Sequence, residues 1–145
     1  MNNNLKYMQI AIKEAEKAYL KEEVPVGAVI VYNNKIIAKA HNQKESKNNS
    51  IKHAELIAID KACKKLKTWH LEKCILYTTL EPCIMCTGAI IQSRIKEIYC
   101  STLSNKYGGL NKLNEKEKNK MKIDIGLCKK ESIKLLKNFF KEKRK

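Results

Sequence analysis

The chain has 145 residues, of which 43% are hydrophobic and 31% are charged, a balance that supports one folded domain spanning residues 1–145. No apolar run approaches the roughly 20 residues that a membrane helix needs. The N-terminus lacks the continuous apolar core and the small-residue cleavage site of a secretory signal. We therefore expect a cytoplasmic protein that does not enter a membrane. Without a secretory signal, the six cysteines do not indicate a disulfide framework.

The net charge of +15 suggests a polyanionic partner such as RNA. Coding bias could also produce this charge, because only Arg94 and Arg144 are arginine and the other 28 of the 30 basic residues are lysine. An AT-rich gene would scatter lysines over the chain regardless of function. The charge alone does not decide between an RNA partner and coding bias.

The first half of the chain predicts a helix, a hairpin and a loop. Apolar residues at helical spacing predict an amphipathic helix over 5–20. The β-rich apolar run 24–32 predicts a strand, Asn33-Asn34 a turn, and residues 35–40 the returning strand. The polar stretch 43–52 predicts a loop.

The second half continues with alternating helices and short apolar strands. We expect a helix over 53–66, a strand over 74–79, a helix over 83–92, a strand over 95–101, a loop with a short exposed helix within 104–120, a strand over 121–125 and a final helix over 129–142. This alternation indicates a three-layer α/β fold. The order of the strands in the sheet does not follow from it.

Two short motifs carry the chemistry: His53-Ala54-Glu55 and Pro82-Cys83-Ile84-Met85-Cys86. The first supplies an imidazole and a carboxylate, and the second supplies two thiols one helical turn apart. Zinc binds nitrogen and thiolate ligands, and three protein ligands leave a fourth position for water. A carboxylate beside that water can move protons. This order of motifs matches the known signature of zinc-dependent deaminases.

Both motifs are expected at helix starts, where the partial positive charge of the helix favours thiolate over thiol. Pro82 suits such a start because no amide donor is needed there. His53 and Glu55 are two residues apart, a spacing that places them on opposite sides of a regular helix. We therefore expect the entry to this helix to be irregular.

Taken singly, the cysteine motif is also compatible with a different kind of site. A C-x-x-C pair can be a redox pair or half of a structural zinc site, with His70 or Cys74 as the fourth ligand. A non-catalytic RNA-binding module with structural zinc is therefore one alternative, and an oxidoreductase is another. Taken alone, His41 and His70 are each more typical of a packing or surface residue than of a metal ligand. The remaining cysteines are expected to be small buried hydrophobes: Cys63, Cys74, Cys100 and Cys128.

Five stretches along nearly the whole chain carry a family resemblance: residues 79–90 (TLEPCIMCTGAI), residues 23–29 (EVPVGAV), His53-Ala54-Glu55, Ser93-Arg94-Ile95 and Phe139-Phe140-Lys141. Together they resemble the bacterial-type tRNA-specific adenosine deaminases. The zinc motifs alone fit any cytidine-deaminase-like enzyme, and a deaminase of free guanine, cytosine or a nucleoside is the nearest alternative. The lysine excess and the basic tail 141–145 favour a nucleic acid.

The resemblance implies one zinc ion held by His53, Cys83 and Cys86, with Glu55 as the proton shuttle. It implies a mixed five-stranded sheet flanked by helices and a homodimer. The implied substrate is the wobble adenosine in the anticodon stem-loop of an arginine tRNA, which is converted to inosine.

The resemblance also implies nucleotide contacts. Asn42 matches a residue that holds the target nucleotide, and Val26 matches a wall beside the base. Lys106 stands in Ser104-Asn105-Lys106, where the family has Asp-x-Lys, and residues 49–52 read Asn-Ser-Ile-Lys where it commonly has Asp-Pro-Thr-Ala. Both changes bear on nucleotide contacts and not on the zinc ligands.

Phe139 and Phe140 are adjacent on the expected final helix and point about 100° apart. One ring can pack on the core while the other meets a base. Burial of both rings is equally compatible with the sequence. The resemblance favours Phe140 as a stacking contact with the RNA.

Overall fold

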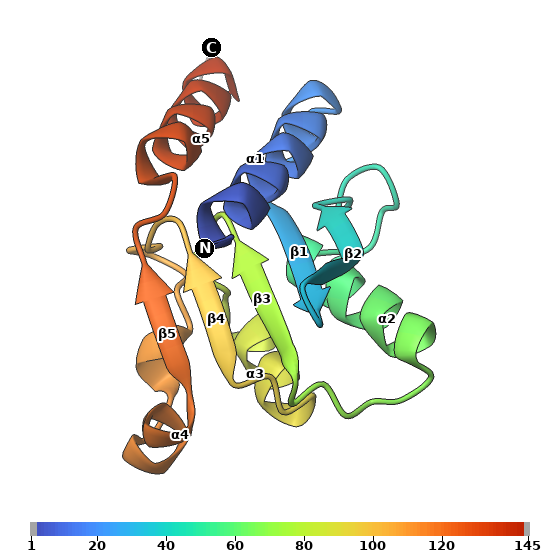
Figure 1. The fold of residues 1–145 in the computed structure, drawn as a ribbon. Helices are drawn as coiled ribbons and strands as arrows, with labels where there is room; N and C mark the ends of the chain where they lie inside the picture. The colour runs from blue at the N-terminus through green and yellow to red at the C-terminus, as the bar shows by residue number, and fades with distance from the viewer. Residues whose placement is uncertain (1–2, 144–145) are drawn as a thin grey trace.

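The computed structural model describes residues 3–143, so Arg144 and Lys145 of the basic tail lie outside the described residues. Five strands form one sheet in the order β2-β1-β3-β4-β5 (Figure 1). The strands are β1 (Gly27–Tyr32), β2 (Lys35–His41), β3 (Cys74–Thr78), β4 (Glu97–Cys100) and β5 (Lys122–Ile125).

The sheet is mixed. Strands β1 and β2 form an antiparallel hairpin whose turn residues, Asn33 and Asn34, both have positive φ, as this kind of tight turn requires. Strand β3 is antiparallel to β1 and parallel to β4, and β4 is parallel to β5. Parallel neighbours need a crossover connection; a helix lies in the crossover from β3 to β4, and two short helices lie in the crossover from β4 to β5.

Helices cover both faces of the sheet (Figure 1). Helix α1 (Asn4–Leu20) covers one face, and α5 (Lys129–Lys143) lies beside α1. Helices α2 (Ala54–Leu66) and α3 (Ile84–Gln92) cover the other face. The 3-10 helix η1 (Leu110–Lys112) and α4 (Glu115–Lys120) lie between β4 and β5 in the chain. The three-layer fold and the mixed five-stranded sheet expected from the sequence are confirmed.

Alternation along the strands divides the core into two clusters. Ala28 and Ile30 of β1 face α2 and α3, whereas Val29 and Val31 face α1, because successive side chains of a strand point to opposite faces. The central position of β3 follows the same rule: Leu76 joins the first cluster and is fully buried. Apolar burial on both faces fixes the register of the central strands.

A glycine at the start of β1 lets the first helix approach the sheet. A Cβ on Gly27 would lie 2.0 Å from the backbone oxygen of Ala11 and 2.6 Å from the backbone nitrogen of Ala15, both in α1. The Gly27 N–H donates to the hydroxyl of Thr79 at 3.0 Å. This contact aligns the start of β1 with the end of β3, shortly before the second motif.

The observed elements follow the expected ones closely and differ at several ends. The strand predicted over 24–32 begins only at Gly27, because the Val26 N–H bonds the carbonyl of Val24 at 2.8 Å in a three-residue turn. The two helices predicted from His53 and Cys83 begin one residue later. Among residues 3–143, no helix is both long and apolar enough to cross a membrane.

Candidate active site

Two helix starts converge on one cluster of ligand atoms. His53 is the N-cap of α2, with extended backbone angles of φ −81° and ψ 149°. Cys83 is the N-cap of α3, with φ −70° and ψ 178°. Because His53 lies just outside the helix, its side chain and that of Glu55 are not forced to opposite sides. The irregular entry predicted from the spacing is therefore confirmed.

The distances within the cluster fit zinc. The Nδ1 atom of His53 lies 3.7 Å from the sulfur of Cys83 and 3.6 Å from the sulfur of Cys86. One ligand atom from each of the three residues lies within 4.8 Å of the others. Tetrahedral zinc, with bonds of about 2.0 Å to nitrogen and about 2.3 Å to sulfur, separates such atoms by about 3.5 Å. The donor set and its spacing can therefore hold one zinc ion.

Neither alternative fourth ligand joins the cluster. The ring of His70 is exposed, stacks on Trp69 at 3.8 Å and pairs with Glu72 at 3.3 Å. Cys74 is buried in the apolar core. Within residues 3–143, the metal-binding group contains only the one histidine and the two cysteines. A closed structural site built on His70 or Cys74 does not exist in the described chain, and three ligands leave one position open.

The surroundings of the two thiols favour ionisation of Cys83 and oppose ionisation of Cys86. The Cys86 thiol and the His53 imidazole lower the pKa of the Cys83 thiol to about 3, against the opposing effect of burial. The ionised Cys83 and burial raise the pKa of Cys86. Zinc ligands must be thiolates, and a cation between the sulfurs relieves the repulsion that keeps the second proton on. With the His53 ring as a third ligand atom within 4.8 Å, the two sulfurs can bind a divalent cation.

Glu55 lies in the first turn of α2 beside this cluster. Its side chain is buried, with the residue only 4% exposed. Burial raises the pKa of the Glu55 carboxyl to about 7, although the neighbouring His53 lowers it. A carboxyl that titrates near neutrality can both accept and release a proton under working conditions. It is not a member of the ligand group.

Asn42 ties the end of β2 to the start of α2. Its backbone N–H donates to the carbonyl of Val26 at 3.1 Å, and its side-chain oxygen accepts from the Ala54 N–H at 2.8 Å. The structure thus places Asn42 next to the histidine-bearing helix start. Val26 is buried in the α2–α3 side of the core, at 4% exposure. Contacts of both residues with a nucleotide stay predictions.

Lys106 and Phe140 lie on separate segments. Lys106 is exposed on the loop between β4 and η1, with its ammonium 5.4 Å from the Tyr107 ring. Phe139 is 7% exposed and packs on Tyr19, whereas Phe140 is 45% exposed. The predicted divergence of the two rings is therefore confirmed.

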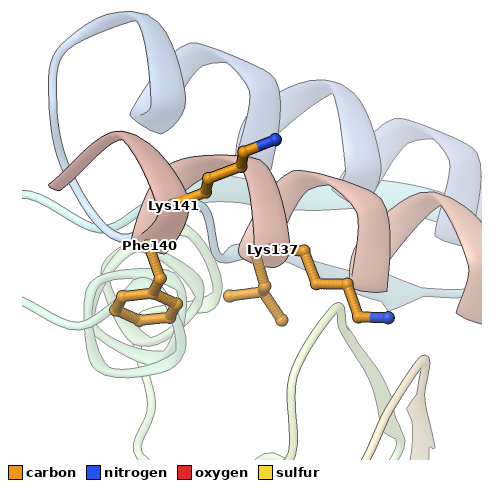
Figure 2. A pocket seen from close by; sticks show the side chains of 4 residues that line it. Lys137, Phe140 and Lys141 are labelled. Carbon is orange, nitrogen blue, oxygen red and sulfur yellow. The ribbon is translucent and has the colours of Figure 1, made fainter. Parts of the chain in front are cut away.

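The exposed ring of Phe140 borders a surface groove on α5. Figure 2 shows Phe140 and Lys137 projecting from the same side of the helix. The groove has a volume of about 330 Å³ and is also lined by Leu136 and Lys141. An aromatic ring among lysines suits RNA, and the contact itself stays a prediction.

Two buried glutamates have a structural role that the sequence motifs did not predict. Glu23 and Glu81 are 1% and 8% exposed, and each accepts two backbone N–H groups from a loop beside the site. Both stand in the stretches 23–29 and 79–90 that resemble the deaminases. Their place in these two stretches was the only feature of the sequence that pointed to them, because a backbone N–H donor can belong to almost any residue type.

Comparison with known proteins defines the class. Residues 1–102 match the family described as the cytidine and deoxycytidylate deaminase zinc-binding region. The match contains His53, Glu55, Cys83 and Cys86, which the structure brings together. The chain therefore belongs to this family of zinc-dependent deaminases.

Relatives that match nearly the whole chain indicate one group within this family. A tRNA-specific adenosine deaminase of Bacillus subtilis is 46% identical over 144 residues, covering 96% of this chain and 89% of the relative. One from Rickettsia bellii is 43% identical, covering 93% and 98%. A solved structure from work on A-to-I editing by tRNA:A34 deaminases is 33% identical, has a TM-score of 0.83 and covers 90% of this chain and 99% of its own. Within its family, the chain belongs with the tRNA-specific adenosine deaminases.

A guanine deaminase is also similar. The solved structure of guanine deaminase from Bacillus subtilis is 39% identical, with a TM-score of 0.66. It covers 71% of this chain, and the match spans 66% of that protein. The similarity to the tRNA deaminases extends further along the chain, into the C-terminal helix.

Proposed function

We propose that this protein hydrolyses the wobble adenosine of a tRNA anticodon to inosine, consuming one water and releasing ammonia, with an arginine tRNA as the substrate. The observation that carries the proposal is the joint presence of a three-ligand zinc site and a buried Glu55 in a chain related end to end to tRNA-specific adenosine deaminases. In this proposal, residues 1–145 form a single deaminase domain.

The zinc ion is held by His53, Cys83 and Cys86. Bound there, zinc supplies a Lewis acid and a water nucleophile of near-neutral pKa. The histidine ring offers Nδ1 to the metal, because this is the ring atom that faces both sulfurs. The two helix N-termini add their partial positive charge and stabilise the thiolates.

Glu55 moves the protons. Its carboxylate accepts a proton from the attacking water and delivers it to N1 of the adenine, and a later proton reaches the departing amino group as ammonia leaves C6. The carboxyl is suited to both directions because burial raises its pKa to about 7. Burial also excludes bulk water, which would otherwise compete for these protons.

The RNA is held outside the zinc cluster. The oxygen of Asn42 is engaged by Ala54, which leaves the side-chain amide group of Asn42 to donate to the nucleotide. The base must leave any stack to reach the cluster, so an anticodon loop is a better substrate than a duplex. The net charge of +15, with Lys106 and the groove beside Phe140, supplies contacts to phosphates and to a flanking base.

The second candidate is deamination of a free base, which the similarity to guanine deaminase raises. An assay distinguishes these two candidate functions. Its substrates are an anticodon stem-loop, the same loop with cytidine at the wobble position, free adenosine and free guanine. We expect turnover of the adenosine stem-loop alone, with binding that weakens steeply as salt is added. Faster turnover of a free base would assign the protein to the small-substrate deaminases.

A homodimer and a cytoplasmic location complete the proposal. Three apolar side chains near the cysteine-bearing helix are exposed in the single chain: Ile84 at 66%, Leu103 at 52% and Tyr107 at 68%. Exposed apolar side chains of this size favour association with a second copy. Light scattering of the purified protein would show a mass of twice 16.7 kDa if the dimer forms.

A further inference from the structure

The loop that leads into His53 is fastened by one buried carboxylate. Glu23, in the connection between α1 and β1, accepts the Glu45 N–H at 3.0 Å and the Ser46 N–H at 2.6 Å, one on each carboxylate oxygen. The base of the same loop is closed by the Gln43 N–H, which donates to the carbonyl of Lys52 at 2.9 Å. Residues 44–48 are exposed, so apolar packing holds this loop only weakly.

The loop after β4 is fastened in the same way. Glu81 accepts the Ser104 N–H on one oxygen and the Leu110 N–H on the other, both at 3.0 Å. A Cβ on Gly108 would lie 2.2 Å from this carboxylate, so the loop backbone packs directly against it. Residues 105–107 are exposed.

Each fastened loop borders one half of the zinc site. The first begins at Asn42 and ends at His53. The second pairs with the cysteine-bearing turn: Gly108 forms a β-bridge with Cys83, and the Gly109 N–H donates to the carbonyl of Pro82 at 2.8 Å. The same loop carries Lys106. Of the residues proposed to contact RNA, Asn42 thus stands at the start of the loop that Glu23 anchors, and Lys106 stands on the loop that Glu81 anchors.

A carboxylate is suited to this task. It accepts hydrogen bonds on both oxygens, and bonds to a charged acceptor are stronger than neutral ones. A glutamine in its place keeps one acceptor and turns an NH₂ group toward the other backbone donor. A buried carboxylate is costly unless it is fully hydrogen-bonded, and both glutamates offset this cost with loop amides rather than with lysines.

We propose that Glu23 and Glu81 are positioning residues that hold the two rims of the RNA site in a preformed shape, each acting on its own loop. The proposal rests on the tRNA substrate proposed above. Because the rims bind the nucleotide and do not take part in proton transfer, the loss of either anchor raises KM for RNA and leaves kcat nearly unchanged. Loosened loops must be ordered again each time RNA binds, which weakens binding.

Hydrogen exchange of backbone amides in the zinc-loaded full chain tests the anchors without reference to activity. In Glu23→Gln we expect the amides of Glu45 and Ser46 to lose protection by about tenfold or more, while those of Ser104 and Leu110 keep theirs. Glu81→Gln gives the reverse pattern. Each variant is thus the matched control of the other. Uniform loss over both loops, or no loss, overturns the proposal. If a glutamine variant does not fold, Glu23→Asp or Glu81→Asp, which keeps the charge and shortens the reach, is measured for the same pattern.

Kinetics on an anticodon stem-loop at fixed salt then separate positioning from simple stabilisation. We expect KM to rise about tenfold in each variant, with kcat within about twofold and one zinc per chain retained. A lower melting temperature with an unchanged KM overturns the positioning role. If the wild-type protein does not deaminate the stem-loop at all, the proposed function fails, and the exchange pattern still decides whether the two anchors exist.

Discussion

The side-chain oxygen of Asn42 accepts a hydrogen bond of 2.8 Å from the backbone N–H of Ala54. One residue thereby satisfies an otherwise unpaired amide at the start of α2 and sits next to the zinc-ligand position His53. The same side chain is proposed to hold the target nucleotide through its amide group. The two tasks use different atoms, so substitutions can separate them.

Replacing Asn42 by aspartate or by alanine separates these tasks. Asn42→Asp keeps the acceptor oxygen and adds a negative charge that suits a helix start, so thermal stability stays near that of the wild type. Asn42→Ala loses the acceptor and destabilises the fold by about 1 kcal/mol. Both variants lose the amide donors, and both raise KM for the stem-loop. A fully active Asn42→Asp variant would contradict the nucleotide contact.

Replacing Glu55 by glutamine removes the proton shuttle and keeps the shape of the side chain. We expect zinc content and melting temperature close to those of the wild type, because Glu55 is outside the ligand group. Deamination falls by at least about 10²–10⁴-fold, the usual contribution of a general acid–base group. Metal analysis, a melting curve and a stem-loop assay check the three statements. Turnover near the wild-type rate would show that another group carries the proton.

The stability of the protein in acid depends in part on Glu23. Burial raises the pKa of this carboxyl, but the N–H donors of Glu45 and Ser46 outweigh burial and hold the pKa below its usual value. The folded state thus releases this proton more readily than the unfolded state. The stabilisation is fully present above the unfolded pKa of about 4.3 and is lost as the pH falls through the folded pKa.

Glu23→Gln should therefore lower the free energy of unfolding at neutral pH and make its decline in acid shallower. Denaturant titrations of both proteins between about pH 3 and pH 7 measure this difference. If the free energy of unfolding falls equally steeply in both proteins below about pH 5, the loop amides do not stabilise the ionised carboxylate.

The two adjacent phenylalanines of α5 provide a matched pair. Phe139→Ala empties a buried position beside Tyr19 and destabilises the fold by about 3–5 kcal/mol. Phe140→Ala leaves stability nearly unchanged and weakens stem-loop binding by about tenfold, because stacking on a base contributes about 1–3 kcal/mol. Melting curves and binding at fixed salt distinguish the two. Unchanged affinity of Phe140→Ala would place the RNA elsewhere.

The sequence predicted the layers, the five strands and the zinc cluster because these depend on local periodicity and on residue types that zinc selects. Amphipathic spacing located α1, and the order of His53, Cys83 and Cys86 located the cluster. The spacing of His53 and Glu55 even indicated an irregular helix start, which the structure provides by placing His53 at the N-cap.

The remaining features depend on contacts that leave no such pattern. The strand order arises from pairing across the sheet, which local periodicity does not encode. The anchoring of two loops by Glu23 and Glu81 uses backbone amides 22 to 29 residues away, and any residue type except proline offers such a donor. From sequence alone, a glutamate in a loop is predicted to lie on the surface, whereas the structure shows both of these glutamates buried.

The most direct test of wobble deamination is to incubate the purified protein with an unmodified tRNA pool and to sequence the pool for A-to-G changes, which report inosine. Glu55→Gln protein serves as the control. We predict conversion at the first anticodon position of an arginine tRNA by the wild type, and none by the variant. An unchanged tRNA pool, together with release of ammonia from free guanine or another free base, would contradict the proposed function.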